Sequence, residues 1–248
     1  MPAAQESQVG ASEHEKIMQT FGQPKAGDPV QAYISRVGAK VAANTERSDV
    51  QYKFFLLDTP MVNAFALPGG YVYVSRGLLA LANNEAELAG VMAHEIGHVT
   101  ARHSAERYSQ GVVTSLGAAL ISTAIGNDYA SQALSVGSDL YIKSYSRGQE
   151  HQADELGVRY LSRAGYDPSA MASFLDAMGR NDDLESRLTG RGGQSEVNYF
   201  STHPRTADRV AQASALASSY PHNPNARVEA ASYLNAIDGI VYGDSPNQ

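Results

Sequence analysis

Residues Leu88 to Val99 read LAGVMAHEIGHV, and the rest of the chain can be interpreted around this stretch. Its only ionisable side chains are those of His94, Glu95 and His98, and its other residues are apolar or small. Such a composition is typical of a helix that is buried nearly all round. Ionisable groups in a buried helix are costly unless they are paired or bind a metal ion, so the stretch predicts a metal site.

The two histidines of this stretch have the spacing of a metal-binding pair. His94 and His98 lie four residues apart, so a helix places both imidazoles on one face, one turn from each other. The pattern His-Glu-x-x-His on a helix indicates zinc, with two core histidines bonded to backbone or water as the alternative. Because a catalytic zinc takes three protein ligands and leaves one position for water, a third ligand is required.

No neighbouring residue supplies this third ligand. A metzincin would continue with Gly and His three and six residues after His98, but those positions hold Ala101 and Ser104. At about 100° per residue, His103 falls on the face of a continued helix opposite His94. We therefore expect His103 to face solvent or to cap the helix.

A better candidate lies in Ser146 to Gly157, which reads SRGQEHQADELG. Glu150 and Asp154 are four residues apart and share one helical face, although a solvated acidic face is the alternative. We predict Glu150 as the third ligand, with Asp154 accepting the second ring N–H of a ligating histidine. His151 is turned by about 100° from Glu150, so we expect it to pack or to face water.

The remaining pattern predicts an α+β fold that is mostly α-helical. Extended segments at Gln51 to Leu57, Val62 to Leu67 and Tyr71 to Ser75 predict a small antiparallel sheet beside the metal-binding helix. Pro68-Gly69-Gly70 supplies turn chemistry between the last two. Nearly everything from Arg76 onward has helical character.

The organisation of the chain predicts a single domain over residues 1–248. The metal-binding helix is expected from Asn84 to about Ser104. Arg180 to Val197 is polar and contains Gly, which predicts a mobile surface connection or lid. Gly243 to Gln248 is expected to be a frayed end.

Composition excludes several classes of protein. The chain has no Cys, which excludes disulfide frameworks and Cys-ligated zinc modules. It has 19 Lys plus Arg against 26 Asp plus Glu, with no basic run, which argues against a nucleic-acid partner. Oligomeric state is not indicated.

No segment has the pattern of a secretory signal or a membrane span. Residues 1–23 are polar, which fits a cytoplasmic protein or an exported chain whose signal has been removed. The longest uncharged apolar stretch, Val112 to Ile125, is shorter than the roughly 20 residues that span a bilayer. It predicts a buried helix or helical hairpin, with peripheral contact to a membrane surface as the alternative.

Four motifs resemble those of M48-family zinc metallopeptidases, in particular minimal bacterial members related to outer-membrane quality-control peptidases. The resemblance extends over at least Val62 to Arg209. The motifs are NAFALPGGYVYV (63–74), HEIGHVTARHS (94–104), SRGQEHQAD (146–154) and STHPRTADR (201–209). The resemblance implies one zinc on His94, His98 and Glu150 within a gluzincin-like domain, with Glu95 as the base that takes a proton from the zinc-activated water.

The resemblance also implies roles that spacing does not supply. His203 is expected near the metal, either as a fourth ligand that blocks the site or as a donor to the oxyanion. Arg209 matches a further position near the site, although a surface arginine is an equal alternative. An edge strand is expected to pair with extended substrate through Asn63, Ala64, Phe65 and Ala66.

These expectations predict a zinc-dependent endopeptidase that acts on unfolded or misfolded polypeptide. Strand pairing through main-chain hydrogen bonds gives affinity without a demand for sequence. The alternative is a latent or non-catalytic zinc protein that assists membrane-protein assembly or quality control, with His203 closing the site. A zinc hydrolase of small molecules is disfavoured by the strand before the site. The resemblance implies a periplasmic or membrane-associated location.

Overall fold

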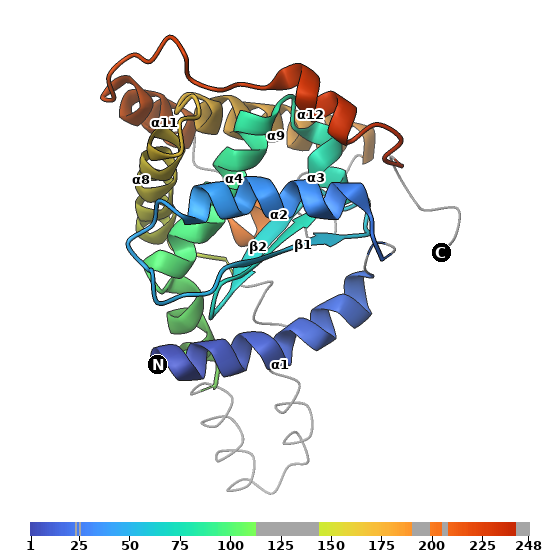
Figure 1. The fold of residues 1–248 in the computed structure, drawn as a ribbon, viewed down its shortest axis with the longest axis vertical. Helices are drawn as coiled ribbons and strands as arrows, with labels where there is room; N and C mark the ends of the chain where they lie inside the picture. The colour runs from blue at the N-terminus through green and yellow to red at the C-terminus, as the bar shows by residue number, and fades with distance from the viewer. Residues whose placement is uncertain (23, 25, 113–143, 190–198, 205–207, 242–248) are drawn as a thin grey trace, which may run out of the picture.

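The computed structural model describes residues 1–241 apart from 23, 25, 113–143, 190–198 and 205–207 (Figure 1). Its fold is α+β and mostly helical, as predicted. The strands are β1 (Lys53–Leu57), β2 (Ala64–Leu67) and β3 (Tyr71–Ser75). The labelled helices are α1 (Ala3–Phe21), α2 (Pro29–Ala42), α3 (Arg76–Leu81), α4 (Glu85–Thr100), α8 (Arg147–Arg163), α9 (Ala170–Thr189), α10 (Tyr199–Thr202), α11 (Asp208–Ser218) and α12 (Ala230–Ala236).

The described sheet is mixed, with the strand order β1-β3-β2. β2 and β3 form the predicted antiparallel hairpin, whose turn uses positive φ angles at Gly69 and Gly70. β1 runs parallel to β3, so the prediction of a purely antiparallel sheet is wrong. The reason is the strand order: β3 lies between β1 and β2. The turn between β2 and β3 reverses the chain, so β3 runs antiparallel to β2 and in the same direction as β1.

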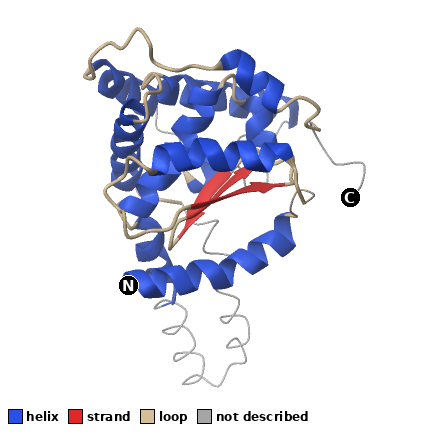
Figure 2. Cartoon of the chain, in the orientation of Figure 1, coloured by secondary structure: helices blue, strands red, loops and turns tan. Residues whose placement is uncertain are grey.

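Helices cover both faces of this sheet (Figures 1 and 2). On one face lie α2 and α4, and there Val72 and Val74 of β3 join the main hydrophobic core. On the other face lies α1, whose Ile17 packs with Phe65 and Tyr73. The sheet is therefore buried from both sides, although it has only three strands.

Helix α4 lies at the centre of the core. The Asn84 side chain accepts a hydrogen bond from Glu87 N and so caps its start. Every residue from Glu85 to Val99 is buried, as the apolar stretch predicts. A Cβ atom added at Gly97 would lie 2.9 Å from Ala153 O, so this glycine permits the close approach of α8.

Helix α8 begins where its sequence indicates a cap. Ser146 and Gln149 form a capping box, in which each side chain bonds the other residue's backbone N–H. Glu150 and Asp154 are both buried on the face of α8 that packs against α4. The approach of the two helices thus brings acidic groups to the histidines of α4.

Two predicted boundaries are wrong. α4 ends at Thr100 rather than near Ser104, because Arg102 adopts a left-handed conformation with φ of 65° before a new helical segment begins at 103. The stretch 180–189, predicted as a mobile connection, instead continues α9. Exposed pairs such as Asp176 with Arg180, at 2.6 Å, favour a helix in this polar sequence.

Other predictions fall outside the described residues. These are the part of the apolar stretch 112–125 that follows Val112, the segment 190–197 and the tail 243–248. Among the helices that the structure describes, none is both long and apolar enough to cross a membrane.

The outer edge of β1 is closed by a side chain of α2. Gln31 Nε2 donates to Phe54 O at 2.8 Å, and Leu56 N donates to Gln31 Oε1 at 2.7 Å. The amide of Gln31 thereby takes the place of a neighbouring strand, which protects this edge from pairing.

Candidate metal centre

Four buried side chains converge on one point. The ligating atoms of His94 and His98 on α4, Glu150 on α8 and His203 after α10 lie within 4.8 Å of one another. His94 Nε2 is 3.1 Å from His98 Nε2 and 3.2 Å from His203 Nδ1. Glu150 Oε1 is 3.0 Å from His203 Nδ1 and 3.4 Å from His98 Nε2.

The outer nitrogens of these rings indicate where the protons lie. His94 Nδ1 is 2.8 Å from Asp154 Oδ1, and a carboxylate can only accept, so the proton of His94 is on Nδ1. His203 Nε2 lies 3.3 Å from Glu95 Oε1 without a hydrogen bond, whereas His203 Nδ1 is hydrogen-bonded to Glu150 Oε1 at 3.0 Å. The inner Nε2 of His94 is then a lone pair that faces the inner nitrogens of His98 and His203. The convergence of four inner ligand atoms on one point is the arrangement that a bound cation requires.

The spacing of the four residues fits a zinc ion. A tetrahedral zinc with ligands at about 2.0–2.1 Å separates neighbouring ligand atoms by about 3.3–3.4 Å. The distances here run from 3.0 Å, between Glu150 and His203, through 3.4 Å, between Glu150 and His98, to 3.6 Å, between His94 Nε2 and Glu150 Oε2. Three imidazoles and one carboxylate are ligands that suit zinc. If zinc were held at this point, His203 would be its fourth ligand.

The charge states of the cluster also suit a cation. Burial lowers the pKa of His203 to about 4 and holds the pKa of His98 well below its ordinary value, so both rings are neutral. Burial alone would raise the pKa of Glu150, but His203, His98 and His94 together hold it well below the ordinary value. The cluster therefore offers neutral imidazoles and one carboxylate anion.

Glu95 lies beside the cluster on α4 and is fully buried. Neither of its carboxylate oxygens has a hydrogen-bond partner within the described part of the chain. Burial, reinforced by the negative charge of Glu150, raises the pKa of Glu95 well above its ordinary value. A buried carboxylate with raised proton affinity is suited to accept a proton from water.

Arg209 and Asp154 support the cluster from behind. Arg209 donates to Asp154 through Nε at 2.9 Å and Nη2 at 2.8 Å, and its Nη1 lies 2.7 Å from Glu150 Oε2. Burial alone would raise the pKa of Asp154, but His94 and Arg209 lower it. Arg209 is only 4 % exposed, which excludes the interpretation of a surface arginine.

The prediction that His103 faces solvent or caps the helix is wrong. Its ring is buried, and Nδ1 lies 3.1 Å from His98 Nδ1. Helical periodicity could not reveal this contact, because the left-handed conformation at Arg102 ends the helix and turns the chain back.

Tyr145 is a further site residue that sequence reasoning missed. Its ring stacks on His98 with centroids 3.8 Å apart, and Arg107 lies over the same ring. The only signal in the sequence is an aromatic residue directly before the cap at Ser146. His151, in contrast, lies near Glu155 in a half-exposed pair away from the cluster, as expected.

The predicted substrate strand lies at the other edge of the sheet. Ser75 N donates to Asn63 O at 3.0 Å, so Asn63 and Phe65 bond toward β3. By the same alternation, Ala64 and Ala66 direct their N–H and C=O groups away from β3. Both alanines are buried, yet no described residue bonds these outward groups.

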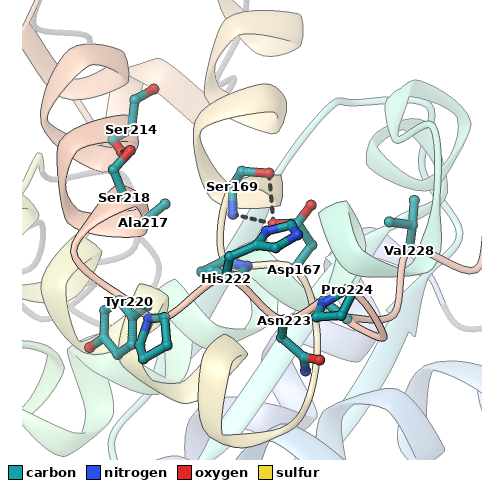
Figure 3. Close-up of a pocket in the computed structure, with 13 residues that line it drawn as sticks. Asp167, Ser169, Ser214, Ala217, Ser218, Tyr220, His222, Asn223, Pro224 and Val228 are labelled. Carbon is teal, nitrogen blue, oxygen red and sulfur yellow. Dashed lines mark hydrogen bonds between the residues drawn. The ribbon is translucent and has the colours of Figure 1, made fainter.

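A pocket of about 710 Å³ lies elsewhere, along α11 and the turn at residues 220–224 (Figure 3). Asp167 Oδ1 accepts from Ser169 N at 2.9 Å and from Ser169 Oγ at 2.8 Å at its rim. None of the four cluster residues lines this pocket, so its shape adds nothing to the chemistry of the metal centre.

Comparison with known proteins agrees with this geometry. The model of peptidase family M48 matches residues 29–217. The chain is 32 % identical over 227 residues to a beta-barrel assembly-enhancing protease of Yersinia pestis, covering 87 % of this chain and 44 % of the relative. It is 30 % identical over 209 residues to the mitochondrial metalloendopeptidase OMA1 of Schizosaccharomyces pombe, covering 83 % of this chain and 59 % of the relative.

A third relative, the beta-barrel assembly-enhancing protease of Escherichia coli K12, is 32 % identical over 200 residues, which is 77 % of this chain and 39 % of the relative. The chain thus spans about half the length of these relatives. The family match covers most of the described fold, including His94, Glu95, His98 and Glu150. The chain belongs to peptidase family M48.

Proposed function

We propose that this chain is a zinc-dependent endopeptidase that hydrolyses unfolded or misfolded polypeptides. The observation that carries the proposal is the convergence of His94, His98 and Glu150 on one point, with Glu95 directly beside it. Bound zinc supplies a Lewis acid that lowers the pKa of a water molecule and polarises a peptide carbonyl.

The protein's own groups supply the rest of the chemistry. Glu95 accepts the proton of the attacking water and passes it to the leaving amine. Its raised pKa suits this task, because a general base works best when its proton affinity is near the operating pH. Asp154 keeps the proton of His94 on Nδ1, so that Nε2 stays available as a ligand.

The outer edge of β2, which no described residue bonds at Ala64 or Ala66, is the proposed binding site for substrate. Ala64 and Ala66 each present one N–H and one C=O on this edge, which an extended peptide can bond as an added strand. Buried backbone groups without hydrogen-bond partners are costly in free energy. A substrate strand that pairs with them therefore gains more binding free energy than it would at a hydrated edge. Such pairing reads the backbone and suits substrates that have lost their fold.

We expect Ala66→Pro to weaken substrate binding. The substitution removes the outward N–H of residue 66 but no hydrogen bond to β3, and proline is tolerated at such edge positions. Loss of one hydrogen bond of about 0.5–1.5 kcal/mol corresponds to a rise in KM of about 2- to 10-fold with kcat nearly unchanged. Steady-state kinetics on an extended peptide measure this, with Ala66→Gly as the control that keeps the N–H. A KM unchanged by proline would exclude strand addition at β2.

The substrate class is tested with one protein in two states. The zinc-loaded chain is incubated with a protein kept unfolded by blocked cysteines and with the same protein in its native fold. Mass spectrometry should find cuts at internal bonds of the unfolded form alone. Equal cleavage of both forms would contradict the substrate class, and cleavage of neither would contradict the endopeptidase.

The names of the bacterial relatives support the same setting. Two bacterial relatives are named as proteases that enhance β-barrel assembly. We propose on this basis a periplasmic or membrane-associated location for this chain, which fractionation of its native host would test.

The second candidate function is a latent zinc protein whose metal site is closed in the resting state. The position of His203 favours it. With four protein ligands a zinc site has no free position for water, and such sites are structural rather than catalytic. His203 follows α10, and Tyr199 N at the start of α10 donates to Val62 O at 3.1 Å. Val62 lies next to β2 on the edge proposed for substrate. In this state the chain holds zinc without acting on substrate until His203 leaves.

We therefore expect His203→Ala to cleave the unfolded substrate faster than the wild type. If the open state is populated at about 1–10 %, removal of the fourth ligand raises the rate about 10- to 100-fold. Initial rates at equal zinc content measure the effect. A fall of about two to three powers of ten would instead identify His203 as an oxyanion donor and contradict the closed state.

A further inference from the structure

A chain of two hydrogen bonds leads away from His98 on the side opposite the cluster. His98 Nδ1 lies 3.1 Å from His103 Nδ1, and His103 Nε2 lies 3.1 Å from Gln152 Oε1. His103 is 3 % exposed and His98 is fully buried, so water does not compete at the inner contact. Gln152 is exposed and lies on α8, two residues after Glu150.

Only one placement of protons satisfies both contacts. Gln152 Oε1 can only accept, so His103 donates from Nε2. A neutral His103 then has a lone pair on Nδ1, which accepts the N–H of His98 Nδ1. The proton of His98 is thereby fixed on Nδ1, and Nε2 is left as a lone pair toward the metal position.

The backbone is held in an unfavourable conformation to make this contact. Arg102 has a φ of 65°, a left-handed conformation that is unfavourable for residues other than Gly. Its guanidinium lies 2.5 Å from Oε1 of Glu6, a buried residue of α1. A continued helix would carry His103 away from His98, so the strained turn is what brings the two rings together.

We propose that His103 and Gln152 are positioning residues that fix the tautomer and orientation of the metal ligand His98. They do for His98 what Asp154 and Arg209 do for His94, but with neutral groups in place of a carboxylate. The proposal rests on the metal-binding part of the proposed function and not on peptidase activity.

The test compares two substitutions of His103 that keep different ends of its ring. His103→Asn keeps an acceptor near the position of Nδ1, whereas His103→Gln keeps a polar group near Nε2 and loses the acceptor. Loss of the group that hydrogen-bonds a metal-ligating histidine typically weakens metal binding by about 10- to 100-fold. We expect that loss for His103→Gln and His103→Ala, and a zinc affinity close to wild type for His103→Asn.

Zinc dissociation constants of the full chain are measured by competition with a chelator, and circular dichroism of the metal-free proteins reports folding. His151→Ala, on the neighbouring half-exposed residue, is the control. Equal affinities for the Asn and Gln variants, whether both weak or both normal, would overturn the proposal. If the wild type binds zinc and the Asn and Gln variants have equal affinities, only this proposal is overturned. If the wild type binds no zinc, the proposed function is overturned as well.

A second measurement does not depend on variants that fold. In a long-range ¹H–¹⁵N spectrum of the zinc-loaded wild type, His103 should carry its proton on Nε2 and His98 on Nδ1. A proton on Nδ1 of His103 would contradict the direction of the hydrogen bonds and overturn the proposal.

Discussion

Glu95→Gln in the zinc-loaded chain is expected to lower kcat for peptide-bond cleavage by about 10²- to 10⁴-fold while zinc stays bound. General base catalysis contributes a factor of this size, and an amide cannot accept the proton of the attacking water. Glu95 is not among the four convergent ligands, so the substitution leaves the metal position intact. It also removes a buried carboxyl whose oxygens have no hydrogen-bond partner in the described structure, so the variant should fold at least as well as the wild type.

The measurement is single-turnover cleavage of an unfolded protein at matched zinc content. Glu155→Gln is the control, since Glu155 lies half-exposed on α8 and is paired with the half-exposed His151. A Glu95→Gln variant that retains more than about a tenth of the wild-type kcat would exclude Glu95 as the base.

Arg209→Met is expected to lower the free energy of unfolding of the metal-free chain by about 3–5 kcal/mol, because it leaves two buried carboxylates without their cation. Asp154 and Glu150 are both about 1 % exposed, and Arg209 contacts both. Methionine has a similar length and apolar stem, so the lost charge rather than lost packing dominates the effect.

Urea unfolding of the metal-free proteins measures this loss. Arg180→Met is the matched control, because its ion pair with Asp176 is exposed on both sides and such pairs contribute about 0–1 kcal/mol. If the two variants lost the same stability, the buried ion pairs of Arg209 would have no special role in holding the cluster together.

The site residues on α4 and α8 could be predicted from sequence because they form two pairs, each within one helix. His94 with His98, and Glu150 with Asp154, need only the helical period of 3.6 residues to share a face. That the two faces meet depends on the close packing permitted at Gly97, which the sequence signals only as a glycine in an apolar helix. His203 and Arg209 lie far along the chain, and no local pattern links them to α4, so only resemblance to a family pointed to them.

The failures have local causes. His103 was misplaced because Arg102 takes a left-handed conformation that sequence patterns associate with Gly or Asn. Residues 180–189 are polar yet helical, since pairs along an exposed helix need no apolar face. α1 was not predicted because two of the side chains that it buries are glutamates. Its buried stripe is Glu6, Gly10, Glu13 and Ile17, and Glu6 is paired with Arg47 and Arg102.

The central claim is that the cluster holds the zinc on which peptide cleavage depends, and zinc titration of the metal-free chain tests it most directly. Bound zinc and cleavage of an unfolded substrate are followed in the same samples, for the wild type and for His94→Ala. We predict that wild-type cleavage rises in proportion to bound zinc and stops rising at one zinc per chain, while His94→Ala neither binds tightly nor cleaves. Cleavage that is independent of bound zinc, or full cleavage by His94→Ala, would contradict the claim.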